Sequence, residues 1–276
     1  TLITPQINNI SATTGAQTTN GNETAFSLRG GFYRLNYIFK DRYLFEANGR
    51  YDGTSRFPTD DRFGFFPSFS AGWNVSEESF MNSAAGWLDQ FKIRGSWGSL
   101  GNQSVESNYG NYPYITSLGS NTSPFILGSG RTPYVSPGGL VSPSLTWETV
   151  VSKNIGLDLA LFSNKLAVTA DYYTRDTKDM LMSVDYPGLL GTGAPASNAA
   201  DLRTNGWELS VTWRDTFGEH GRWGLNLALS DNQTEITKYD NPSGSLSEYY
   251  VGQKIGDIWG YETVGIFQYE SPGMQK

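Results

Sequence analysis

Charged side chains that could bind a ligand or an ion gather in the short segment 52–62. They are Asp52, Arg56, Asp60, Asp61 and Arg62. The three carboxylates would suit Ca²⁺, but their spacing does not follow the alternating ligand positions of an EF-hand loop. Two interpretations remain: the segment contacts a ligand or a partner protein, or its arginines and aspartates pair with one another in a structural loop. No metal site is predicted.

A second set of candidates lies in the long stretch 99–146, which is rich in Gly, Pro and Ser. The residue types that suit binding are Asn102, Gln103, Tyr112 and Tyr114. Tyrosine rings offer flat apolar surfaces, and amides both donate and accept hydrogen bonds, so together they match the ring faces and hydroxyl groups of sugars. The alternative is that the stretch docks against neighbouring loops or a partner protein. The sequence leaves both open.

Signals of enzymatic chemistry are absent from the sequence. It contains no Cys and a single His, His220, in a short Gly-flanked segment that reads as a solvated turn. None of the nucleophile-elbow, P-loop, dinucleotide-binding or zinc-protease motifs occurs. The net charge of -7 disfavours nucleic acid, because phosphates bind to basic surfaces. We therefore expect no enzyme, no cofactor and no nucleic-acid partner.

The elements that would position the candidate residues are β-strands. In residues 222–232, Trp223, Leu225 and Leu227 alternate with the polar Asn226 and Ser230, which is the period of a strand with one apolar and one polar face. The same alternation predicts eight strands, over 33–39, 42–51, 63–75, 91–98, 154–161, 165–175, 206–214 and 222–232.

The polar faces of these strands carry ionisable residues of both signs. They are Arg34, Arg50, Arg94, Asp158, Asp171, Arg175, Glu208 and Arg214. In a barrel such residues line a wet channel. Because both signs occur, a mutual ladder of ion pairs is the simpler interpretation.

The connections between the predicted strands alternate between short and long. Short links fall at 40–41, 163–164 and 218–221, and a medium one at 77–90 predicts a turn of helix. The long stretches are 52–62, 99–146, 177–204 and 233–256. This alternation is typical of an all-β, antiparallel, up-and-down transmembrane β-barrel, whose turns are short on one side of the membrane and long on the other. No apolar run approaches the 18 or so residues of a transmembrane helix.

Aromatic residues, 14% of the chain, recur near the ends of the predicted strands. They are Tyr43, Tyr51, Phe63, Trp73, Trp207, Trp213 and Trp223, and Trp147 lies at the start of another strand. Amphipathic rings are favoured at the two membrane interfaces, so these residues are predicted to form interfacial girdles. The alternative is the core of a soluble β-sandwich, which alternates in the same way. The unequal connections favour the barrel.

Seven segments, in order, resemble one protein family. They are 42–57, 63–73, 92–98 with 101–103, 145–148, 171–173 with Thr177, 205–208 and 260–268. Their types and spacing are similar to the barrel of the SusC/RagA family of TonB-dependent outer-membrane transporters, over residues 24–270. The resemblance implies a 22-stranded barrel with a plugged lumen. We expect residues 1–276 to be an internal part of such a barrel, about eight strands, without plug domain, TonB box or signal peptide.

The resemblance also implies a function and partners. The parent protein would sit in bacterial outer-membrane lipid and import oligosaccharides or peptides, with a SusD-like surface lipoprotein as a lid and the TonB–ExbB–ExbD complex as its source of energy. The segment 52–62 and the stretch 99–146 would then contact ligand or lid, and the polar-face residues would face the lumen and plug. The alternatives are a siderophore or cobalamin receptor, a passive porin or adhesin, and a soluble glycan-binding sandwich.

Overall fold

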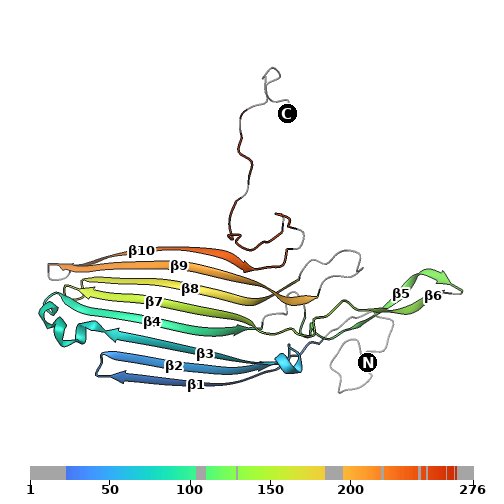
Figure 1. Cartoon of the computed structure of the whole chain (residues 1–276), viewed down its shortest axis with the longest axis horizontal. Helices are drawn as coiled ribbons and strands as arrows, with labels where there is room; N and C mark the ends of the chain where they lie inside the picture. Colours follow the sequence, from blue (N-terminus) through green and yellow to red (C-terminus); the bar gives the residue numbers. More distant parts are fainter. Residues whose placement is uncertain are drawn as a thin grey trace.

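The described part of the chain forms ten antiparallel strands, eight of them in one sheet. The computed structural model describes residues 23–103, 110–128, 130–183, 195–218, 221–241, 244–246, 248–258, 260–263 and 265. The main sheet contains β1 (Leu28–Phe39), β2 (Tyr43–Thr54), β3 (Phe63–Asn74), β4 (Leu88–Asn102), β7 (Glu148–Leu161), β8 (Leu166–Ser183), β9 (Ala196–Phe217) and β10 (Gly221–Lys238), paired in that order (Figure 1). The predicted all-β, up-and-down arrangement is confirmed.

The two ends of the main sheet differ in their connections (Figure 1). At one end, β1–β2 and β7–β8 are joined by tight turns whose residues have positive φ, among them Lys40 at 52° and Asn164 at 62°. Left-handed residues let a tight turn match the right-handed twist of its two strands. The β3–β4 link at the same end holds the short 3-10 helices η3 (Val75–Glu77) and η4 (Ser79–Ala84), as predicted. We call this the short-turn end; His220 belongs to its β9–β10 link and lies outside the described residues.

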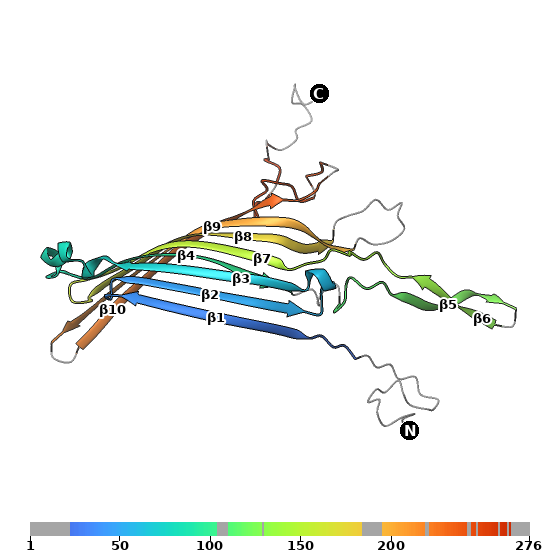
Figure 2. The same ribbon diagram turned by 60° about the horizontal axis from the view of Figure 1, so that its bottom comes forward.

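The opposite end, the long-loop end, differs from the prediction. Strands β8 and β9 have 18 and 22 residues, so they reach well into the predicted loop 177–204. The stretch 99–146 also contains a separate hairpin, β5 (Leu118–Leu127) and β6 (Gly130–Pro137), which projects beyond the main sheet (Figure 2). Side-chain alternation in the sequence did not predict the hairpin or the long ends of β8 and β9. In both places the strand pairing contains register shifts, where side chains no longer alternate regularly.

The main sheet is a single layer with an exposed apolar face. The register places Leu35 opposite Ala47, and Ile155 opposite Tyr172, so apolar side chains face the same way across the sheet. Leu35 is 65% exposed and Leu225 64% exposed. A sheet in water must bury one face against another layer, yet the described residues contain no second sheet stacked on this one. The apolar face therefore has the character of a lipid-facing band rather than a sandwich core.

Among the described residues, no helix has the length and apolar character needed to cross a membrane.

A small cluster of buried hydrophobic residues lies at the long-loop end. Phe57 is fully buried, Leu145 is 1% exposed, and both pack with Phe66, Trp147 and Ala196. The Trp147 ring lies edge-on to Phe57 and Phe66, with centroid distances of 5.5 and 5.3 Å. Its indole Nε1 donates to the carbonyl oxygen of Arg62 at 3.2 Å. The prediction of Trp147 as an interfacial girdle residue is wrong, because its ring is buried in this cluster.

Truncating Phe57 tests the importance of this cluster. We expect Phe57→Ala in the full-length protein to lower the free energy of unfolding in detergent by about 3–5 kcal/mol, because it leaves a cavity beneath Trp147. Phe32→Ala is the matched control, since Phe32 is 81% exposed. Equal losses in denaturant titrations of the two variants would contradict a structural role for the cluster.

A buried carboxylate fastens the 3-10 segment to the short-turn end. Glu78 Oε1 accepts hydrogen bonds from the Tyr43 hydroxyl at 2.7 Å and from Trp73 Nε1 at 3.1 Å. Its Oε2 pairs with the Arg42 guanidinium at 3.3 Å. The hydrogen bonds from Tyr43 and Trp73, aided by the charge of Arg42, hold the pKa of Glu78 below its ordinary value.

This arrangement predicts a pH dependence of stability. A carboxyl whose pKa is lowered by folding stabilises the fold above its unfolded pKa, about 4.5, and that stability is lost as the pH falls through the folded pKa. We expect Glu78→Gln to remove this acid-sensitive part of the stability, measured as thermal midpoint against pH from 3 to 7. The neighbouring exposed Glu77→Gln is the control. If both variants keep the wild-type acid sensitivity, the contribution of Glu78 is refuted.

Candidate functional site on the polar face of the sheet

The strand register places all eight predicted polar-face residues on the same side of the main sheet. The pairs Arg94↔Gly156, Gly156↔Asp171 and Asp171↔Glu208 show this directly, because directly opposed residues share a face. The same pairing, followed strand by strand, includes Arg34, Arg50, Asp158, Arg175 and Arg214. The face is therefore mainly polar, although Phe32, Ile38 and Leu100 also lie on it.

Arg94 is the centre of an ion-pair network that joins three strands. Its Nε lies 3.0 Å from Asp158 Oδ2, and its Nη1 and Nη2 lie 2.7 and 2.6 Å from the two carboxylate oxygens of Asp171. Asn154 donates to Asp171 Oδ1 at 3.0 Å. Two parallel N–H···O bonds to one carboxylate are the strongest geometry available to arginine. The network therefore holds β4, β7 and β8 in fixed register on the polar face.

Gly156 lies between the partners and allows them to meet. A Cβ at this position would lie 2.6 Å from Arg94 Cζ and 2.7 Å from Asp171 Oδ1, so any side chain here would force the Arg94–Asp171 pair to shift. Sequence reasoning selected Arg94, Asp158 and Asp171 but missed Asn154 and Gly156. The signal was available, because a glycine inside an alternating strand often marks a close approach by neighbouring groups.

Two further ion pairs lie along the polar face. Arg34 Nη2 lies 2.6 Å from Glu46 Oε2, and Arg50 Nε lies 2.9 Å from Asp52 Oδ2. These pairs join β1 to β2 and link neighbouring positions within β2. Asp171 also lies directly opposite Glu208. The structure thus groups some predicted residues into short ladders of pairs, while Arg175 and Arg214 lie apart from them.

The candidates of segment 52–62 have different surroundings. Arg56 is buried and its guanidinium carbon lies 3.9 Å from the centre of the Phe26 ring. Arg62 donates to the Phe57 carbonyl at 3.4 Å. Asp60 and Asp61 lie on the 3-10 helix η2 (Thr59–Asp61), whereas Asp52 lies on β2 and pairs with Arg50. In the described ranges no group of three or more acidic, His or Cys side chains could hold a metal ion.

Two of the candidates in stretch 99–146, both tyrosines, fasten that stretch to the segments next to β1 and β2. Tyr112 donates to the carbonyl of Ala25 at 2.7 Å, and Tyr114 to that of Ser55 at 3.2 Å. Asn102 donates to Glu148 at 3.1 Å, and Gln103 follows directly after β4. The side chains of Asn102 and Tyr112 remain exposed at the long-loop end.

Together these features define a class of protein. Antiparallel strands pair in sequence order, one face is apolar and exposed, the other is polar and ion-paired, and short turns and long loops lie at opposite ends. That combination describes a section of an up-and-down membrane barrel with a hydrophilic lumen.

The chain belongs to the family described as TonB dependent receptor-like, beta-barrel, whose model matches residues 3–263. It is thus part of an outer-membrane β-barrel, and the resemblance and the location inferred from the sequence are confirmed. The prediction that the chain is not an enzyme is confirmed at the level of the family, whose members are transporters.

Known relatives agree with this assignment. The chain is 30% identical over 260 residues to TonB-dependent receptor P39 of Formosa agariphila, covering 92% of this chain and 24% of that protein. It is 34% identical over 244 residues to TonB-dependent receptor SusC of Bacteroides thetaiotaomicron, covering 84% and 23%. The solved RagAB peptide importer in its open-open state matches with a TM-score of 0.70 and 25% identity, covering 83% and 24%. The chain spans about a quarter of the length of these proteins.

Breaking the Arg94 network should destabilise the barrel. We expect Arg94→Met in the full-length protein to lower the free energy of unfolding by about 1–3 kcal/mol, because two carboxylates lose their charged partner. Asp171→Asn should lower the free energy of unfolding less in the Arg94→Met background than in the wild type. A double-mutant cycle, measured by denaturant unfolding, gives this difference. Arg175→Met is the control, since Arg175 is exposed on the same face. Additive effects of Arg94→Met and Asp171→Asn would disprove the coupling.

Proposed function

We propose that the chain forms part of the barrel of a TonB-dependent active transporter that imports oligosaccharides or peptides with a SusD-like surface lipoprotein. The observation that supports this most directly is a sheet with one lipid-type face and one ion-paired polar face. Its relatives include SusC and, among solved structures, the RagAB peptide importer. We propose likewise that residues 1–276 are one part of a larger barrel, consistent with their share of the relatives' length.

The long-loop end is the proposed place of contact with substrate or lid. Asp60, Asn102 and Tyr112 are the predicted loop residues whose side chains are exposed there. A carboxylate, an amide and a phenol can bond sugar hydroxyls and peptide groups equally well, because both present donors and acceptors close together. This chemistry fits either substrate class and gives no reason to expect a metal chelate.

The polar face is the proposed wall of the lumen. Its arginines and aspartates largely neutralise one another in pairs, so a hydrated solute can pass or a folded domain can pack there without meeting a strong field of one sign. In the proposal, a plug domain of the parent protein fills this space. The TonB–ExbB–ExbD complex would supply energy through that plug.

Uptake by cells tests the proposal. We expect cells that contain the full-length transporter and its lipoprotein to accumulate labelled oligosaccharides or peptides, and deletion of the transporter to abolish accumulation. Collapse of the proton gradient should stop uptake in wild-type cells, because import is energised. Uptake that continues without the gradient would indicate a passive pore, and uptake of iron chelates alone would favour a siderophore receptor.

A further inference from the structure

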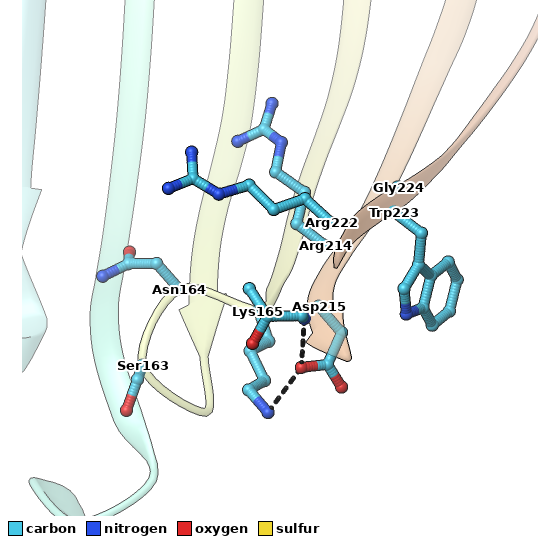
Figure 3. A pocket seen from close by; sticks show the side chains of 9 residues that line it. Ser163, Asn164, Lys165, Arg214, Asp215, Arg222, Trp223 and Gly224 are labelled. Carbon is cyan, nitrogen blue, oxygen red and sulfur yellow. Dashed lines mark hydrogen bonds and ion pairs between the residues drawn. The ribbon is translucent and has the colours of Figure 1, made fainter. Parts of the chain in front are cut away.

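A hollow of about 540 Å³ opens at the short-turn end, between the turn that joins β7 to β8 and the hairpin of β9 and β10. Its lining includes Arg214, Arg222 and Asn164, together with Lys165, Asp215 and Trp223 (Figure 3). The two arginine side chains extend to the same side of the ribbon, with Asn164 near them at the turn.

The strand register explains why the two arginines lie together. Arg214 is opposite Gly224 and Arg222 is opposite Thr216, so the arginines are diagonal neighbours on one face of the β9–β10 pair. Diagonal positions lie about 7–8 Å apart, within reach of long side chains. Gly224 adds no side chain between them. The two guanidinium groups can therefore act on one ligand.

The face on which they lie is the polar one. Arg214 shares its side of β9 with Glu208, whereas Trp213 and Trp223 lie on the other side, in the apolar band. Lipid headgroups would meet the apolar side. The arginine pair is therefore directed toward the lumen and away from the bilayer.

Two carboxylates of the described part of the chain lie close to the hollow, and each has another partner. Asp89 Oδ2 accepts a hydrogen bond from the backbone N–H of Asn164 at 2.9 Å. Lys165 Nζ pairs with Asp215 Oδ1 at 2.8 Å, so this carboxylate already has a partner. Neither Arg214 nor Arg222 forms an ion pair with a described residue. Glu208 is the next carboxylate on their face of β9, six residues away, which is roughly 20 Å along a strand. Two like charges this close repel each other unless an anion lies between them.

We propose that Arg214 and Arg222, with the amide of Asn164, bind a carboxylate or phosphate group at the short-turn end of the lumen. This rests on the proposed function, in which the polar face lines the lumen. Guanidinium groups bond both oxygens of such anions through paired N–H groups, which fits a site built from two arginines. The anion has two possible sources: a free solute in the lumen, or a carboxylate side chain from another part of the full-length polypeptide.

The test uses the full-length transporter, purified in detergent, with inorganic phosphate as the probe. Thermal unfolding is followed for the wild type, for Arg214→Gln/Arg222→Gln, and for the control Arg131→Gln/Lys254→Gln, which removes the same charge from exposed residues at the long-loop end. If the site takes a free anion, phosphate raises the wild-type and control midpoints saturably, and the double variant needs at least tenfold more phosphate for the same shift.

If the site holds a carboxylate of the same polypeptide, phosphate leaves the wild-type midpoint unchanged. The double variant then unfolds several degrees lower than the wild type at low salt, and the control does not. Arg222→Lys, which keeps the charge but loses the paired donors, should show an intermediate effect in either case. The proposal is overturned if the double variant and the control match the wild type with and without phosphate. Because import is measured separately, energised uptake alongside that result would leave the proposed function intact.

Discussion

Backbone hydrogen bonding is the constraint on which this structure depends. In hydrocarbon no water replaces a missing partner, so every strand that crosses a membrane must pair along both edges. Inside the main sheet, β2, β3, β4, β7, β8 and β9 each have two neighbours. The outer strands β1 and β10 each have one. The outer edges of these two strands must be paired along their whole length in the membrane, so the sheet is stable there only as part of a closed barrel.

With the ladder fixed, the two faces of the sheet follow from alternation alone. Ile155 and Leu157 face one side, and Asn154 and Asp158 the other. The apolar side chains are stable in contact with lipid, whereas the charged side chains of the polar face require nearby groups of opposite charge. Arg94 meets this requirement by bridging two aspartates across three strands, and Gly156 allows this by leaving space. Register, charge pairing and a single glycine thus act together.

Much of this arrangement could be predicted from the sequence, and the reasons for the failures are physical. Period-two alternation located the eight strands of the main sheet and placed Arg94, Asp158 and Asp171 on one face, because side-chain direction in a strand depends only on position. It could not locate the β5–β6 hairpin or the ends of β8 and β9, where bulges interrupt the period. Nor could it show that Trp147 turns inward onto Phe57, since that contact joins residues ninety positions apart.

The order of the strands has a consequence for how such a chain folds. Each strand of the main sheet pairs with the strand next to it in the sequence, except where β4 and β7 meet across the stretch that holds β5 and β6. Nearly all of the sheet can therefore form by closing one hairpin at a time, with little loss of chain entropy at each step. Pairing of β4 with β7 closes the longest loop in the sheet, so it has the largest entropy cost. A longer stretch between these two strands would slow their pairing without changing the pairs in the finished sheet.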